Sequence, residues 1–189
     1  MNGGLHPVLD EHLEALRQAG SSIHALLSSE TAPNRAAVED QIAAAGYAVR
    51  SEVVDFFTWR GVATLTEFMA VKQDFFPENT YPISVDGALR FQACNRQVFL
   101  DAGMSEADLE DTCAAARLLP VLRLDSDQWA SVDCSLGGSG GALVQCYGSG
   151  GSYELAPSLM VAFRDATAAL ATGQLRLEGG QIVGVTDRT

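Results

Sequence analysis

Basic residues are scarce in this 189-residue chain, which has 12 Lys and Arg against 24 Asp and Glu and a formal net charge of −12. Such a chain repels phosphate backbones and anionic headgroups, so the composition argues against a nucleic-acid partner and against membrane binding. The same charge would attract a basic protein, although an excess of acid also serves solubility. The charge therefore excludes classes of partner more firmly than it identifies one.

Long apolar runs are also missing. No stretch approaches the roughly 20 apolar residues that a membrane-spanning helix needs. The opening residues, MNGGLHPVLDEHLEALRQ, lack the basic start and the apolar core of a secretory signal. We therefore expect a soluble, cytoplasmic protein. Its length and its hydrophobic content of 47% are typical of one globular domain with a sizeable core.

Residues that bind metals or carry redox chemistry are few and scattered. The cysteines, at 94, 113, 134 and 146, form no Cys-x-x-Cys pair, and the three histidines all fall within the first 24 residues. Buried reduced thiols are the expected state. The run SLGGSGGAL, 135–143, has no lysine and joins two predicted strands, so it is no phosphate-binding loop. The sequence predicts neither a metal nor a cofactor.

Helical periodicity dominates the first hundred residues. Apolar side chains recur on one face from Leu5 to Leu27, with a kink or break expected at Gly20-Ser21-Ser22. Further helices are predicted over 35–45, 52–60, 85–101 and from 106, with caps at Asn34, Ser51, Ser84 and Ser105. Residues 62–83 contain two prolines and are predicted to form a short strand and an ordered loop.

The apolar period changes to two after residue 118. Strands predicted near 122–124, 129–134 and 143–147, joined by Asp-, Ser- and Gly-rich turns, form an antiparallel meander. A helix capped by Ser158 then runs to about Ala171, and Gly179-Gly180 suits a C-terminal hairpin turn. N-terminal helices, a central meander, a late helix packed on the sheet and a hairpin predict an α+β fold. We expect residues 1–30 to form a helical extension and residues 34–189 a single domain.

The segment LLPVLRLDSDQWASVDCS, 118–135, places three aspartates close to a tryptophan. Asp125 and Asp127 occupy a predicted turn, where Asp side chains bond their own backbone. They also begin a calcium-loop pattern, but its glycine at the sixth position and its glutamate at the twelfth are absent. Asp133 lies in a strand and would have to converge with a turn aspartate to form an acid–base pair. No histidine, lysine or cysteine completes a catalytic set, so we expect no enzyme.

Four segments resemble the SUKH superfamily, specifically its Smi/Knr-type group of fungal cell-wall assembly regulators and bacterial immunity proteins. They are NRAAVEDQIAAAGYAVRSEVVDFFTWRG, FFPENTYPISVDGAL, LLPVLRLDSDQWASVDCS and APSLMVAFRDATAALATG. The resemblance covers about residues 34–178. The chain departs from the family pattern at Tyr47-Ala48-Val49, where Leu-Pro is usual, and at Arg60-Gly61, where Asn-Gly is usual.

The resemblance implies a scaffold that binds other proteins and has no general catalytic residues. The candidate binding surface would then comprise Asp125 and Asp127 on an exposed rim, with Trp129 and Asp133 at or near it. Many bacterial members of the family neutralise a secreted toxin, often a nuclease, and an acidic inhibitor would associate rapidly with a basic nuclease. One alternative is a regulatory or scaffolding module with an endogenous partner. A less favoured one is a metal site built from the three aspartates.

Overall fold

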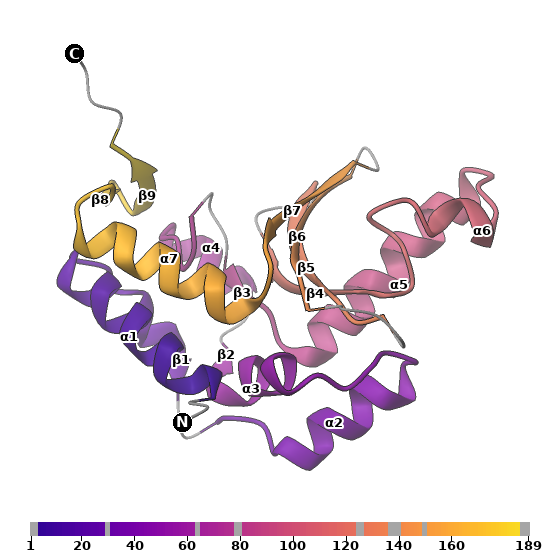
Figure 1. Ribbon diagram of the computed structural model, residues 1–189, viewed down its shortest axis with the longest axis horizontal. Helices are drawn as coiled ribbons and strands as arrows, with labels where there is room; N and C mark the ends of the chain where they lie inside the picture. Colours follow the sequence, from indigo (N-terminus) through magenta and orange to yellow (C-terminus); the bar gives the residue numbers. More distant parts are fainter. Residues whose placement is uncertain are drawn as a thin grey trace.

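An antiparallel sheet of five strands lies at the centre of the molecule (Figure 1). The computed structural model describes residues 4–28, 31–62, 65–77, 81–123, 127–135, 141–148 and 151–185. The strand order is β3-β4-β5-β6-β7. The bounds are β3 Tyr81–Pro82, β4 Leu118–Arg123, β5 Gln128–Asp133, β6 Leu143–Tyr147 and β7 Ser152–Ala156. Strands β4 to β7 follow one another in chain order, which confirms the predicted meander.

Both faces of this sheet are buried, each under different elements. The register places Trp129 opposite Cys146, and Val132 opposite Leu119 and Leu143. Because side chains alternate along a strand, Trp129 and Cys146 share one face, which we call the α5 face. Val132 and its two partners share the other, which we call the main-core face. A strand covered on both sides needs apolar residues at successive positions, as the sequence LLPVL of β4 shows.

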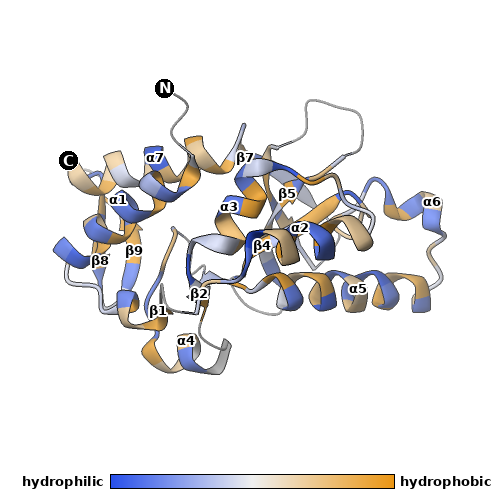
Figure 2. Cartoon of the chain, turned by 90° about the horizontal axis from the view of Figure 1, so that it is seen from below, coloured by the Kyte–Doolittle hydropathy of each residue, from blue (hydrophilic) through white to orange (hydrophobic). Residues whose placement is uncertain are grey.

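Helix α5, Val85–Asp101, covers the α5 face. Its start is fixed by Ser84, whose hydroxyl accepts a hydrogen bond from the Gly87 N–H at 3.2 Å. Phe91 and Phe99 pack toward the sheet, and the Phe91 ring meets Trp129 edge-to-face with centroids 5.0 Å apart. The helix leads to the short helix α6, Glu106–Leu109, at one end of the molecule in both Figure 1 and Figure 2.

Helices from both halves of the chain build the core on the main-core face. Helix α1, Leu5–Gln18, packs along α7, Leu159–Ala171, and both contact α3, Ser51–Trp59. The apolar stripe of α1 belongs to the same cluster as the sheet, so the boundary expected near residue 30 is not a boundary in the packing. The other elements are η1 Ile23–Leu26, β1 Leu27–Ser28, α2 Arg35–Ala44, β2 Gly61–Val62, α4 Leu65–Val71, β8 Leu175–Glu178 and β9 Gln181–Gly184.

Most predicted elements begin and end where their caps and turns place them. The side chains of Asn34, Ser84, Ser105 and Ser158 each accept a hydrogen bond from the backbone N–H three residues later. The hairpin of β8 and β9 turns at Gly179-Gly180, where both residues have positive φ. The α+β fold class is confirmed.

The differences from prediction have physical reasons. Helix α4 occupies part of the predicted loop, and its Glu67 and Ala70 have high helix propensity. Strand β7 is not predicted from the sequence, because it is an exposed edge strand with little apolar alternation. Ser51 is the first residue of α3, and Arg50 takes the cap position. Cys134 and Cys146 lie in different clusters: Cys146 pairs with Trp129 on the α5 face, whereas Cys134 belongs to the main core.

His12 ties α1 to two other parts of the core. Its Nε2 lies 2.7 Å from the Phe75 carbonyl oxygen, which can only accept, so this nitrogen carries the proton. Its Nδ1 lies 3.0 Å from the Thr167 hydroxyl, and its ring packs edge-on against Phe75 and Phe163. We expect a half-buried histidine from the sequence, but the side chain is fully buried. Burial lowers the pKa of His12 to about 4.

We predict that the fold loses stability as the pH falls from 6.5 to about 4. The unfolded chain protonates His12 near the upper value, whereas the folded chain keeps it neutral down to the lower one, so protonation favours unfolding. The contribution is complete above pH 6.5, is lost progressively below it, and is on the order of 3 kcal/mol. Urea unfolding across this pH range measures it. His12→Gln should flatten the dependence, and identical curves for the two proteins would contradict the assignment.

Candidate protein-binding surface

The three described residues of the binding surface expected from the sequence do not lie together on the surface. Asp127 is exposed and precedes β5, whereas Asp133 ends the same strand, which rises about 3.3 Å per residue and so separates them. Trp129 is 1% exposed and packs under α5, so its expected place on a binding surface is wrong. The Asp127 carbonyl accepts from the Gly148 N–H at 2.7 Å, which fastens this end of β5 to the turn after β6. Asp125 lies outside the described residues.

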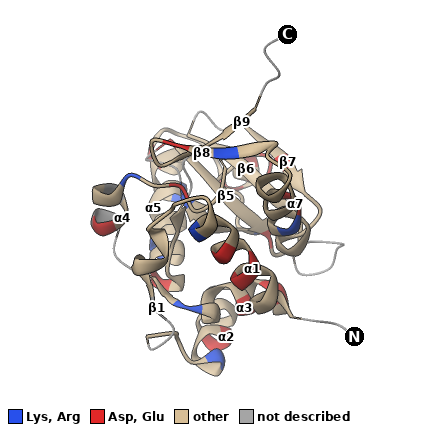
Figure 3. Ribbon diagram, turned by 90° about the vertical axis from the view of Figure 1, so that its left-hand side faces the viewer, with Lys and Arg blue, Asp and Glu red and all other residues tan. Residues whose placement is uncertain are grey.

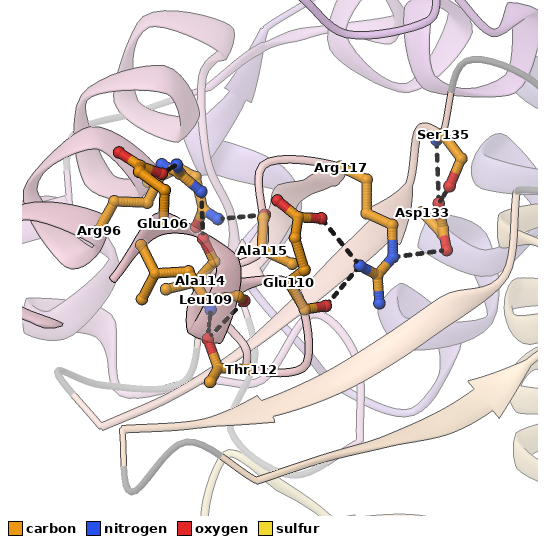
Figure 4. Close-up of polar contacts among 11 residues, drawn as sticks. Arg96, Glu106, Leu109, Glu110, Thr112, Ala114, Ala115, Arg117, Asp133 and Ser135 are labelled. Carbon is orange, nitrogen blue, oxygen red and sulfur yellow. Dashed lines mark hydrogen bonds and ion pairs between the residues drawn. The ribbon is translucent and has the colours of Figure 1, made fainter. Parts of the chain in front are cut away.

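Asp133 takes part in a polar network instead (Figure 4). Its carboxylate accepts hydrogen bonds from the Ser135 backbone N–H, at 2.9 Å, and from the Ser135 hydroxyl. It also lies 3.4 Å from Nε of Arg117. Arg117 in turn donates to the Glu110 carbonyl oxygen at 2.6 Å and lies 3.4 Å from the Glu110 carboxylate. Asp133 therefore positions an arginine that fastens the segment after α6 to the sheet.

That segment carries a concentration of carboxylates. Between positions 97 and 116 there are five acidic residues and no Lys or Arg. We call this group the acidic lobe; all its members are exposed, and they are Asp101, Glu106, Asp108, Glu110 and Asp111. The lobe lies at the end of the molecule opposite α1 and the β8–β9 hairpin (Figure 1). The side of the molecule around α1, α2 and α4 instead carries acidic and basic segments intermixed (Figure 3).

Buried side chains attach the lobe to the body of the protein. Leu109 is fully buried, and Cys113 and Ala115 pack into the core of the α5 face. Ser105 and Asp108 form a capping box that fixes the start of α6. Hydrogen bonds from the Ser105 hydroxyl and backbone N–H lower the pKa of Asp108, so its carboxylate keeps its charge. The lobe is thus a defined structure that presents its carboxylates outward.

Two arginines lie at the base of the lobe, but they neutralise it only in part. Arg96 donates to the Ala114 carbonyl oxygen at 2.8 Å and pairs with Glu106 (Figure 4). Arg117 pairs with Glu110 as described above. The Glu106 and Glu110 side chains remain 66% and 52% exposed, so solvent screens both pairs. Five carboxylates against two arginines leave a net negative surface.

Asp101 and Asp111 have no ion-pair partner among the described residues. Asp101 is the last residue of α5, at the negative end of the helix dipole, and no basic residue lies in that last turn. Among the described side chains, the Gln97 amide donates to its carboxylate at 2.7 Å. One turn earlier, Val98 leaves 65% of its surface exposed. The end of α5 therefore combines an exposed apolar side chain with a carboxylate that the helix dipole disfavours.

A cavity of about 230 Å³ lies at the starts of α3 and α7, and its lining does not favour catalysis. Its described lining contains no histidine, cysteine or lysine, and hence no nucleophile paired with such a base. Both of its charged residues are engaged: Arg50 donates to the Ser135 carbonyl at 2.9 Å, and Glu52 accepts from the Met160 N–H at 3.4 Å.

Two other kinds of site are absent from the part of the chain that the structure describes. No group of three or more His, Cys, Asp or Glu there could hold a metal ion. Nor does that part contain a helix with the length and apolar character that crossing a bilayer requires.

The acidic lobe is the feature that sequence reasoning missed. Its signal is present in DAGMSEADLEDT, 101–112, where five acidic residues occur with no basic one. The chain matches no model of a known protein family, and no curated protein matches it as a relative. The likeness to the SUKH superfamily therefore rests on the four segments quoted above.

We predict that Asp101→Asn stabilises the protein by about 0.3–1 kcal/mol, because it removes a negative charge from the negative end of a helix. Asp86→Asn is the matched control, since Asp86 lies in the first turn of the same helix, where a carboxylate is favourable. This second change should destabilise by a similar amount. Urea unfolding at low ionic strength measures both. A loss of stability on Asp101→Asn would show that the carboxylate serves the fold.

Proposed function

We propose that this protein is a non-enzymatic binding module that holds a basic protein against its acidic lobe. The observation that carries the proposal is the concentration of five exposed carboxylates in a segment without basic residues. Fields of exposed charges extend about 8–10 Å at physiological ionic strength, so carboxylates act together only when they are clustered in this way. Opposite potentials raise the association rate and disfavour wrong partners.

The outer face of α5 supplies the apolar part of such a contact. Cys94 and Val98 of α5, and Ala102, which caps the helix, follow one another at a spacing of four residues and are all exposed. Residues at this spacing share one side of a helix, and the row ends at the acidic lobe. Protein interfaces commonly combine an apolar centre with a polar rim, and this surface offers both.

The resemblance to SUKH immunity proteins gives the proposal its specific form. The partner would be a toxin, such as a basic nuclease, that the protein meets in the cytoplasm and inactivates by occupying its surface. A nuclease binds phosphates through Lys and Arg, so a cluster of carboxylates can compete with nucleic acid for the same residues. Inhibition then requires no chemistry from this chain.

The test is purification of the tagged protein from its own cells at low salt, with mass spectrometry of what co-elutes. We expect a basic partner in stoichiometric amount. Asp101→Asn combined with Asp111→Asn should weaken its binding about tenfold and reduce the salt dependence, because both carboxylates lie on the lobe. The control, Glu11→Gln with Asp40→Asn, changes the net charge equally at exposed positions on α1 and α2 and should bind nearly as the wild type does.

An inhibition assay distinguishes a toxin-neutralising protein from a regulatory module with an endogenous partner. If the partner degrades nucleic acid, an equimolar amount of this protein should block the degradation, and the lobe variant should require more. A partner that is abundant in all growth states and has no toxic activity would favour the regulatory module. Equal binding by the lobe variant, the control and the wild type would contradict the role of the lobe.

A further inference from the structure

The main core is open to solvent between β7 and β8. A groove of about 390 Å³ lies there, within the range of pockets that bind ligands. Its lining includes Phe76, Leu155 of β7, Leu175 of β8 and three alanines of α7, Ala162, Ala166 and Ala169. Helix α7 runs from β7 toward the β8–β9 hairpin (Figure 1), so these elements frame the groove.

The groove continues the core beyond the last strand of the sheet. Phe76, Ala162 and Ala166 belong to the main-core cluster, and Leu155 and Leu175 pack against it. The α7 alanines lie three and four residues apart, on one side of the helix. Their short side chains leave space that larger apolar residues would fill. A surface of this kind is complementary to apolar side chains from another chain.

Strand β7 lies beside this space as an edge strand. It is the last in the order β3-β4-β5-β6-β7 and, among the described strands, pairs only with β6. An edge strand presents backbone N–H and C=O groups to which an extended peptide can hydrogen-bond. In a strand added to β7, every second side chain would point to the main-core face. Those side chains would lie over the groove.

The charged residues near β7 indicate which kind of segment could pair with it. Asp165 is the charged residue of the groove lining, and Glu154 lies on β7; both are exposed and have no ion-pair partner among the described residues. A second copy of this chain would bring the same two carboxylates and a net charge of −12. Self-association through β7 is therefore disfavoured, and a basic segment is favoured.

We propose that an extended segment of a partner protein, with alternating apolar and basic residues, pairs with β7 and places its apolar side chains in the groove. This surface uses no residue of the acidic lobe, so the inference goes beyond the proposed function and can fail or hold independently of it.

The test uses a phage-displayed library of twelve-residue peptides selected on the full-length protein. We expect enriched peptides with apolar residues at alternate positions and Lys or Arg between them. Ala169→Phe, which fills the groove from its half-buried rim, should weaken a selected peptide about tenfold, the size of an interface hot spot. Ala168→Phe is the control, because Ala168 is the exposed neighbour on α7 and does not line the groove.

Glu154→Gln provides a second variant that leaves the packing unchanged. Glu154 pairs with Val144, so its side chain lies on the α5 face, to which the Lys or Arg residues of an alternating peptide would point. The change should weaken such peptides severalfold, with a smaller salt dependence. Thermal unfolding confirms that each variant is folded. Enrichment of peptides with helical spacing, or equal binding by Ala169→Phe and Ala168→Phe, would overturn the proposal. So would a failure to enrich any alternating sequence. Sedimentation should show a monomer; a dimer that Ala169→Phe abolishes would make a second copy the occupant.

Discussion

Burial of both faces of the central sheet is the constraint on which the rest of the structure depends. In β5, the four successive residues from Trp129 to Val132 are buried. One layer of helices can cover only half of them, so α5 and the helices of the main core are both required. A helix of 17 residues spans about 25 Å and a strand of six about 20 Å. The helix that buries Trp129 is therefore longer than the strands that it covers, and its last turn leads into the acidic lobe.

Asp101 of the lobe differs from the carboxylates that join distant parts of the fold. Asp55 accepts from the Leu5 N–H at 3.1 Å and so caps α1 from another helix. Asp74 is buried and accepts from the Ile182 N–H at 2.8 Å, which fastens the last hairpin. These carboxylates join elements that are far apart in sequence. Among the described residues, Asp101 accepts from Gln97 of its own helix, and its charge opposes the helix dipole, so it does not join distant elements.

The features predicted correctly from sequence are those set by local chemistry. Ser84 and Ser158 cap helices because their hydroxyls reach a backbone N–H three residues away, whatever the remaining chain does. The face on which Trp129 lies depends on the cover that α5 supplies, and only the folded chain decides this. The acidic run of the lobe is visible in the sequence, but its exposure follows from the burial of Leu109 beneath it. The groove joins residues near 76, 155 and 175, and no local pattern connects them.

The contact between α1 and α7 has a consequence for synthesis. The hydrogen bond between His12 and Thr167 joins residues 155 positions apart. On the ribosome, the apolar stripe of α1 emerges long before the helix that covers it, at about 5–20 residues per second. The main core is therefore completed late, through contacts of long sequence separation, and such topologies fold slowly. Until α7 emerges, the N-terminal stripe is a surface that a chaperone can bind, and a chain stalled before residue 159 would keep it exposed.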